Sequence, residues 1–286
     1  MTAKKAPSKL RASKPTKTAK RLKVLIYGPA GVGKTTAAIQ FPRPYLLDTE
    51  RGAENDQYVD LLDASGGAVF GTTSFDDIVQ EVRTLASESH DFRTLVIDPI
   101  TVIYDDLVAS WEKRVGTDFG RGYSAAKKQW KRLTALLSTL DMNVVMTSHA
   151  KNQYAEGGGL KIVGMTFDGP KGADYYHDLV LEVSKESDGT RTATVRKSRI
   201  VGFPEGESFE FSYPEVARRY GDEVLEAAVT PVQFATAEQV QAAREMLNAR
   251  TDGDELETKW LRKAGVEDLA DMTFDQMEAS IAWLKK

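Results

Sequence analysis

Short apolar runs alternate with amphipathic stretches along the first half of the chain. Four runs rich in apolar and β-branched residues have the length of buried strands; they cover residues 22–27, 45–50, 94–98 and 143–149. The stretches between them have helical periodicity, over residues 34–41, 75–87, 102–113 and 125–140. Because strands and helices alternate, we expect an α/β fold with a mainly parallel central sheet flanked by helices.

The pattern changes after His149. Residues 150–172 are polar and rich in glycine, including Gly157–Gly159, and are predicted to form a long loop that orders only on a ligand or a neighbouring subunit. Two further strands are expected over residues 178–185 and 192–199. The turn Ser187–Gly189 joins them directly, so they should be antiparallel.

The last part of the chain has a helical pattern. Thr236 with Gln239, and Thr273 with Gln276, have the spacing of capping boxes at the start of amphipathic runs. The chain is therefore predicted to divide into a basic arm over residues 1–21, a core over residues 22–228 and a C-terminal unit of three helices over residues 232–286.

Charge is unevenly distributed between the arm and the rest of the chain. Residues 1–23 hold nine Lys or Arg and no acidic residue, while the whole chain has 38 basic and 42 acidic residues and a net charge of −4. Residues 24–286 therefore carry 29 basic against 42 acidic residues, a net charge of −13. The arm has little to bury and is predicted to be disordered. It either contacts nucleic-acid phosphates or serves as a solubilising tail.

Composition excludes several classes of protein. The chain has no cysteine, which excludes disulfides and thiolate metal sites, and its three histidines lack the spacing of a zinc motif. No apolar run approaches the roughly 20 residues of a membrane-spanning helix, and no apolar segment follows the basic N-terminus as in a signal peptide. We expect a cytoplasmic protein with no membrane partner.

Residues 28–35 match the phosphate-binding pattern G-x-x-x-x-G-K-[ST] in full, between a predicted strand and a predicted helix. Glycines let backbone N–H groups converge on phosphate oxygens, Lys34 would reach the β- and γ-phosphates, and Thr35 would hold Mg²⁺. The motif predicts an ATP site formed by Gly28, Pro29, Ala30, Gly31, Val32, Gly33, Lys34, Thr35 and Thr36.

Two acidic residues are candidates for the chemistry beside this loop. Asp98 ends an apolar strand, as an aspartate that contacts Mg²⁺ would. Pro99 occupies the next position, where many ATPases carry a catalytic glutamate, so the base must come from elsewhere. Glu50 ends the strand after the phosphate-loop helix, and the carboxyl ends of parallel strands meet at the edge where ligands bind. We expect it to orient the attacking water.

The order of these motifs, followed by KGADYYHDLVLEV and RKSRI, resembles the RecA family of ATPases over about residues 22–215. The resemblance implies that Glu50 activates water and that His149, a glutamine in better-known members, senses the γ-phosphate. It also implies that Lys197 and Arg199 reach the nucleotide of a neighbouring subunit, and that the 150–172 loop binds DNA. The trimmed core, basic arm and helical tail look most like phage single-strand annealing ATPases of the Sak type.

Residues in two glycine-rich segments are candidates for single-stranded DNA contact. Basic side chains beside aromatic ones suit single strands, because phosphates are neutralised while bases stack. The candidates are Lys151, Asn152, Gln153, Tyr154 and Lys161 in the 150–172 loop, with Arg121 and Tyr123 in the loop over residues 116–124. The competing interpretation of the 150–172 loop is a lid over the nucleotide.

These inferences predict a Mg²⁺-dependent ATPase that binds single-stranded DNA and acts in annealing or homologous recombination. The expected assembly is a homo-oligomer, a ring or a filament, with nucleotide at its subunit interfaces. A single-strand-binding protein is a further expected partner, and a phage-encoded protein would act in the host cytoplasm. The alternatives are a ring-forming helicase motor and a nucleotide-switched adaptor with slow hydrolysis. A small-molecule kinase is disfavoured because residues 150–172 contain no arginine for its lid.

Overall fold

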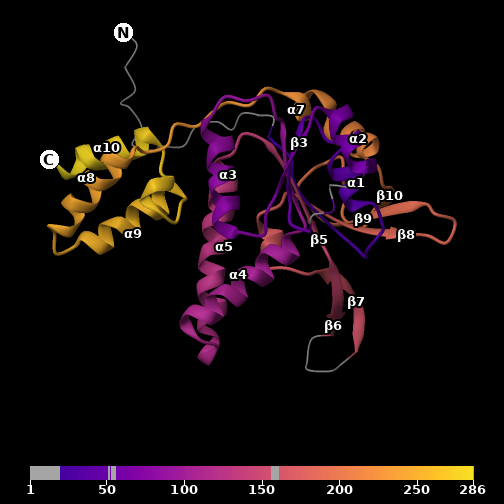
Figure 1. The fold of residues 1–286 in the computed structure, drawn as a ribbon, viewed down its shortest axis with the longest axis horizontal. Coiled ribbons are helices and arrows are strands. Elements are labelled where there is room, and N and C mark those ends of the chain that lie inside the picture. Colours follow the sequence, from indigo (N-terminus) through magenta and orange to yellow (C-terminus); the bar gives the residue numbers. More distant parts are fainter. Residues whose placement is uncertain (1–19, 51, 53–55, 156–160, 286) are drawn as a thin grey trace, which may run out of the picture.

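The computed structural model describes residues 20–285, except residues 51, 53–55 and 156–160. Nearly all of the predicted disordered arm lies outside the described residues. Within them, a central sheet has the strand order β10-β9-β8-β1-β5-β4-β2-β3 (Figure 1). Its strands are β1 (Lys23–Tyr27), β2 (Pro44–Asp48), β3 (Ala68–Gly71), β4 (Thr94–Asp98), β5 (Asn143–Ser148), β8 (Leu179–Lys185), β9 (Arg191–Ser198) and β10 (Ser208–Glu210). The six neighbouring strands β8, β1, β5, β4, β2 and β3 run parallel to one another, which confirms the predicted fold class.

Helices cover both faces of this sheet. Successive residues of β1 enter opposite layers, Val24 and Ile26 on one side and Leu25 and Tyr27 on the other, so the strand is apolar from Val24 to its end. The first layer packs against α1 (Lys34–Ala38), α2 (Asp56–Ser65), α6 (Tyr213–Tyr220) and α7 (Asp222–Glu226). The second packs against α3 (Phe75–Ser87), α4 (Ile100–Val115) and α5 (Arg121–Thr139).

The sequence pattern did not indicate several of these elements. The edge strand β3 buries only alternate residues partially, and β10 has three residues, so neither gives a continuous apolar run. Helix α2 buries only Leu62 fully among its described side chains, whereas α3 buries five residues, so α2 has no clear apolar stripe. Short peripheral elements are defined by the sheet that they join, which a local pattern does not reveal.

The prediction of a loop over residues 150–172 is wrong in part. Strands β6 (Ala150–Tyr154) and β7 (Ile162–Phe167) form an antiparallel ribbon outside the main sheet (Figure 1). Its side chains are mostly exposed, so the two strands satisfy each other's backbone groups without an apolar pattern. Gly157–Gly159, predicted to be flexible, lie outside the described residues.

The predicted loop over residues 116–124 is also shorter than expected. Helix α5 begins at Arg121, so Arg121 and Tyr123 lie in its first turn and not in a loop. Gly120, with a left-handed backbone (φ 67°), is the residue that caps the start of α5. The helix therefore begins four residues earlier than predicted.

The C-terminal helices are α8 (Ala237–Asn248), α9 (Gly253–Ala264) and α10 (Phe274–Leu284), with a core of their own around Leu247 and Met277. Both predicted capping boxes are present, at Thr236 and Thr273. The buried carboxylate of Asp271 receives hydrogen bonds from Arg83 of α3 and from Arg132 of α5, the latter at 2.8 Å. These charged contacts hold the C-terminal helices beside α3 and α5.

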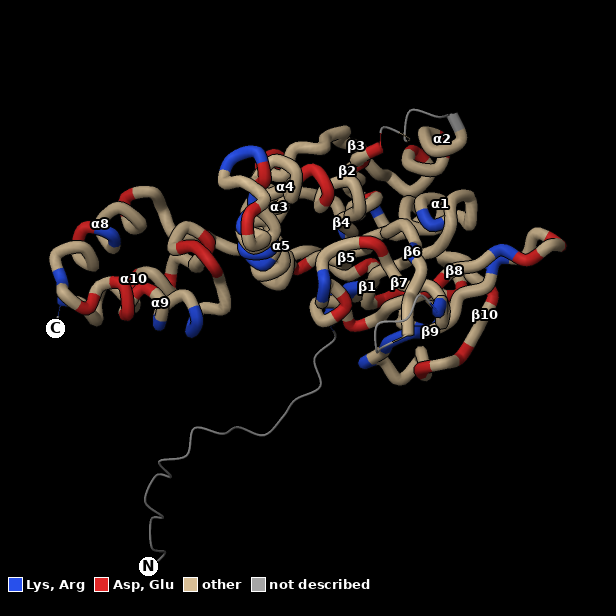
Figure 2. Tube along the Cα trace, turned by 90° about the horizontal axis from the view of Figure 1, so that it is seen from below, with Lys and Arg blue, Asp and Glu red and all other residues tan. Residues whose placement is uncertain are grey.

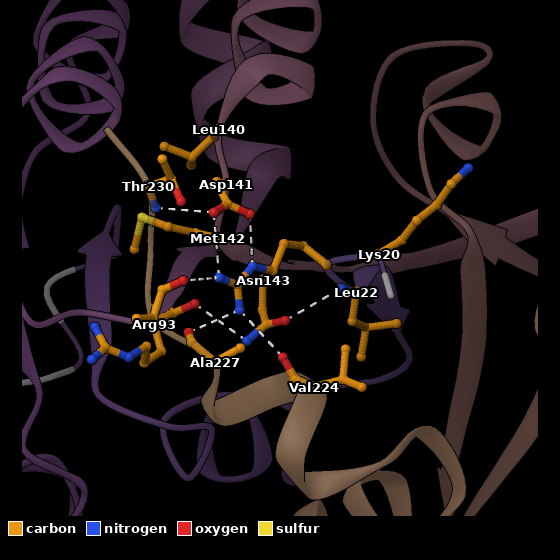
Figure 3. A network of polar contacts seen from close by, with 12 residues as sticks. Lys20, Leu22, Arg93, Leu140, Asp141, Met142, Asn143, Val224, Ala227 and Thr230 are labelled. Atoms are coloured by element: carbon orange, nitrogen blue, oxygen red, sulfur yellow. Dashed lines mark hydrogen bonds and ion pairs between the residues drawn. The ribbon is translucent and has the colours of Figure 1, made fainter. Parts of the chain in front are cut away.

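A polar network lies at the amino ends of β1 and β5 (Figure 3). Arg21 donates to Asp141 Oδ1 at 2.9 Å and to the carbonyl of Ala227 at 2.9 Å. The buried amide of Asn143 donates to the carbonyl of Leu225 at 2.8 Å. These hydrogen bonds tie the segment after α7 to the amino ends of the strands. The loop between β1 and α1 lies at the other, carboxyl, ends. No helix within the described ranges is long and apolar enough to span a membrane.

Candidate functional site

The loop between β1 and α1 has the backbone that its glycines allow. Gly31 and Gly33 have φ values of 75° and 90°, in the left-handed region that other residues avoid. A Cβ atom on Gly28 would lie 2.2 Å from the carbonyl oxygen of Val183 in β8, so only glycine fits between the loop and that strand. Each of these three positions therefore requires glycine for its own steric reason, and the loop packs closely against β8.

Lys34 is buried at the start of α1. Its Nζ donates to the carbonyl oxygens of Gly28 and Pro29, each at 2.9 Å, so the ammonium group lies inside the curve of the loop. Burial lowers the pKa of Lys34, and the nearby carboxylates of Asp98 and Glu50 oppose that shift. The ammonium group is thus oriented by the loop and close to both acids.

Asp98 lies buried at the end of β4, beside the phosphate loop. Two hydroxyls donate to its carboxylate, one from Thr35 behind the loop and one from Thr147 of β5. Burial raises the pKa of Asp98, whereas these two hydrogen bonds lower it. A cation at this position would relieve the cost of burying the carboxylate.

The residues present fit a magnesium ion bound together with a nucleotide. Asp98 and the Thr35 hydroxyl, in direct contact, would hold it. No group of three or more His, Cys, Asp and Glu among the described residues could form a metal cage. Mg²⁺ in nucleotide sites takes one or two protein carboxylates and completes its shell with phosphates and water, so two protein ligands suffice.

Glu50 and His149 are brought together at the same edge. His149 Nε2 lies 3.0 Å from Glu50 Oε1, and both side chains are about half exposed. Glu50 is two residues beyond the end of β2, where its backbone N–H donates to Asp48 Oδ1 at 3.1 Å. His149 contacts one oxygen of the Glu50 carboxylate, so the other oxygen can accept a proton from water.

His149 also marks the start of the ribbon. Its backbone N–H donates to the Thr101 hydroxyl at 3.1 Å, and its carbonyl accepts from the N–H of Asp168, just beyond β7, at 2.8 Å. The hydroxyls of Thr101 and Ser148 each donate to the carbonyl of Asp168 at 2.7 Å. Both ends of the ribbon are therefore fixed next to the residue that contacts Glu50.

The candidate DNA contacts lie on and around this ribbon. Asn152, Gln153 and Tyr154 are exposed on β6, and Lys161 is exposed just before β7. Lys151 Nζ pairs with Asp168 Oδ1 at 2.9 Å. Lys151 and Tyr123 line one cavity of about 310 Å³, between α4 and the base of the ribbon. Arg121 is exposed at the first position of α5.

The candidate trans-acting pair lies farther along the sheet, because β8 separates β9 from β1. Lys197 Nζ donates to the carbonyls of Asp174 and His177, the latter at 2.9 Å. Arg199, one residue past the end of β9, pairs with Asp178 at 3.4 Å. Both side chains therefore contact the segment that precedes β8.

Sequence reasoning missed Thr147, Thr101 and Arg191. Each hydroxyl is a polar position within or next to an apolar element, which is a weak indication, and its partner depends on the order of the strands. Arg191 begins β9, and its Nε lies 2.7 Å from where a Cβ on Gly33 would be. No local pattern predicts that this guanidinium group packs against the phosphate loop.

Nucleotide phosphates require converging backbone N–H groups, a cation that reaches them and a carboxylate for the metal. This edge of the sheet brings the glycine-rich loop, Lys34 and Asp98 together, which places the protein among the P-loop NTPases. The profile of the AAA domain family matches residues 20–210, more than half of the chain, and the chain belongs to this family of nucleotide-binding ATPases. None of the curated proteins compared with the chain matches it.

Proposed function

We propose that the protein is a RecA-like, Mg²⁺-dependent ATPase that binds single-stranded DNA and promotes strand annealing in homologous recombination. The observation that carries this proposal is the continuity of the nucleotide site with the exposed ribbon. His149 contacts Glu50 at 3.0 Å and is followed directly by β6. A change at the terminal phosphate of ATP would therefore act on the base of the surface that meets DNA. The resemblance in layout to phage annealing ATPases of the Sak type supports the annealing role that we propose.

Hydrolysis would use the residues at the carboxyl edge in distinct roles. Lys34 binds the terminal phosphates, while Thr35 and Asp98 hold Mg²⁺, which neutralises phosphate charge when bound. Glu50 accepts a proton from the attacking water as the new oxygen–phosphorus bond forms and the bond to the bridging oxygen breaks. His149 holds the Glu50 carboxylate in position through their 3.0 Å contact.

The DNA contact predicts a measurable loss in a loop variant. Changing Lys151 and Lys161 to alanine should weaken binding of a labelled oligonucleotide and flatten its dependence on salt by about 1.4 in the log–log slope, about 0.7 per phosphate contact. Fluorescence anisotropy at several salt concentrations measures both quantities. The matched control changes the exposed Lys185 and Lys259 to alanine, which removes the same charge from another part of the surface.

Deletion of residues 1–20 separates the ribbon from the basic arm. If binding disappears with the arm and is indifferent to both ribbon lysines, the ribbon assignment is wrong. The pairing of Lys151 with Asp168 adds a second check. Asp168→Asn frees the ammonium group and should tighten binding slightly.

We further propose that nucleotide is bound between subunits, with Lys197 and Arg199 completing the neighbour's site. Each active centre then needs two chains. Mixing Lys197→Ala chains with Glu50→Gln chains should restore part of the hydrolysis that each variant lacks, because some interfaces pair an intact Glu50 with an intact Lys197. Recovery is measured as phosphate release against the total chain concentration. No recovery, with a rate per chain independent of concentration, would show a self-contained site.

A further inference from the structure

Helix α5 carries positive charge without any negative charge. Its 19 residues include Arg121, Lys127, Lys128, Lys131 and Arg132, and no Asp or Glu. This composition is unusual in a chain whose net charge is −4 and whose acidic residues outnumber the basic ones. Arg132 has a structural partner in the buried Asp271. The other four cations form no ion pair with a residue in the described part of the chain.

The three lysines lie on the solvent face of α5. The face opposite them is buried through Ala126, Trp130, Leu133 and Leu137. Lys127, Lys128 and Lys131 are exposed, and none forms an ion pair with any residue that the structure describes. Figure 2 shows the basic positions in blue along the α5 backbone.

A merely solvated helix face would be expected to mix charges. Helix α9 does so, with Asp254, Glu255 and Glu257 against three basic residues. Cations are also favoured in the last turn of a helix, near its negative end. The lysines of α5 lie in the middle of the helix, and its last turn has no basic residue. Helix energetics therefore do not account for the lysine face, which we name the α5 basic face (Lys127, Lys128 and Lys131).

Aromatic side chains are exposed at the beginning of the same helix. Phe119 is fully exposed between two glycines with positive φ, Gly116 and Gly120, and itself has φ 52°. A phenylalanine held in the left-handed region and in solvent is costly on both counts. Tyr123, in the first turn of α5, is also exposed. Basic side chains that follow aromatic ones are the combination that binds single strands, by neutralising phosphates and stacking bases.

We propose that the α5 basic face, with Phe119 as a base-stacking residue, is a binding surface for single-stranded DNA in addition to the ribbon. The inference rests on the proposed function and extends it to a surface that the ribbon candidates do not include. Along α5, Arg121 to Lys131 covers about 15 Å at 1.5 Å per residue, long enough to follow several phosphates. The strand would cross from the exposed Phe119 along the helix.

The experiment measures binding of a labelled single-stranded oligonucleotide by the full chain at several salt concentrations. Changing Lys127, Lys128 and Lys131 to alanine should flatten the log–log salt slope by about 2, at about 0.7 for each of three lost contacts. The matched control changes Lys185, Lys259 and Lys263, three exposed lysines elsewhere. A triple Lys→Arg variant of the α5 basic face should keep the parent slope. Phe119→Ala should weaken binding without changing the slope.

The outcomes separate this inference from the function on which it rests. If the parent chain binds no single-stranded DNA, the proposed function fails. If the parent binds but the α5 alanine triple binds like the control triple, only the α5 surface is wrong. Binding of the parent to anionic phosphatidylserine vesicles in place of the oligonucleotide would identify a different partner and overturn the proposal. Thermal unfolding and solution mass, equal to those of the parent, confirm that each variant is folded.

Discussion

Replacement of Lys34 with alanine should abolish ATP hydrolysis and weaken nucleotide binding while the protein stays folded. The ammonium group lies inside the phosphate loop, held by the carbonyls of Gly28 and Pro29, where it would meet the terminal phosphates. Loss of one such charge-stabilising group commonly lowers turnover by about 10²–10³-fold, and the phosphate lysine also contributes to binding. Phosphate release and calorimetric titration with Mg-ATP measure the two effects.

Two control variants separate the loss of the Lys34 ammonium group from a loss of folding. Lys34→Met keeps most of the aliphatic stem in its buried position and should lose activity equally, and Lys185→Ala removes an exposed lysine without effect. The thermal midpoint of each variant is compared with that of the parent. Undiminished turnover in a folded Lys34→Ala protein would contradict the assignment of the nucleotide site.

Replacement of Glu50 with glutamine should leave ATP binding intact and reduce hydrolysis by about 10²–10⁴-fold, the usual contribution of a general base. Glutamine keeps the size of the side chain, and its amide oxygen can keep the contact with His149 Nε2. What is lost is the carboxylate oxygen that takes the proton. Single-turnover hydrolysis and nucleotide affinity separate the chemical step from binding.

A matched substitution in the same class is Glu88→Gln, at the exposed end of α3, which should not change the rate. If Glu50→Gln hydrolyses ATP near the parent rate, the role of base moves to another acid at this edge. Asp48, the last residue of β2, is the first one to test, as Asp48→Asn.

The central fold was predictable because its strands are buried on both faces. The middle residues of β1, β4 and β5 are apolar on both faces, as in Leu95–Ile97 and Val144–Met146, and the two core layers explain why. The phosphate loop was predictable for a local reason, because its glycines are required by the backbone conformation of the loop and by its close approach to a neighbouring strand. The ribbon was not predictable, because mostly exposed strands need only pair their backbones.

The contacts that assemble the site depend on which strands are neighbours. Thr147 reaches Asp98 because β5 lies beside β4, and Arg191 reaches Gly33 from a strand two places away from β1. Neither pairing is encoded in the spacing along the chain. The contact between His149 and Glu50 is of the same kind, although both residues could be predicted to lie at the carboxyl edge of the sheet.

The proposed function is tested most directly by the steady-state rate of ATP hydrolysis by the full chain, measured with and without single-stranded DNA. We expect Mg²⁺-dependent hydrolysis that rises when single-stranded DNA is added, and no such rise in the Lys34→Ala variant. The reason is that both ends of the ribbon are fixed beside His149, which contacts the proposed base at 3.0 Å. Hydrolysis that is indifferent to single-stranded DNA at every concentration tested would contradict it.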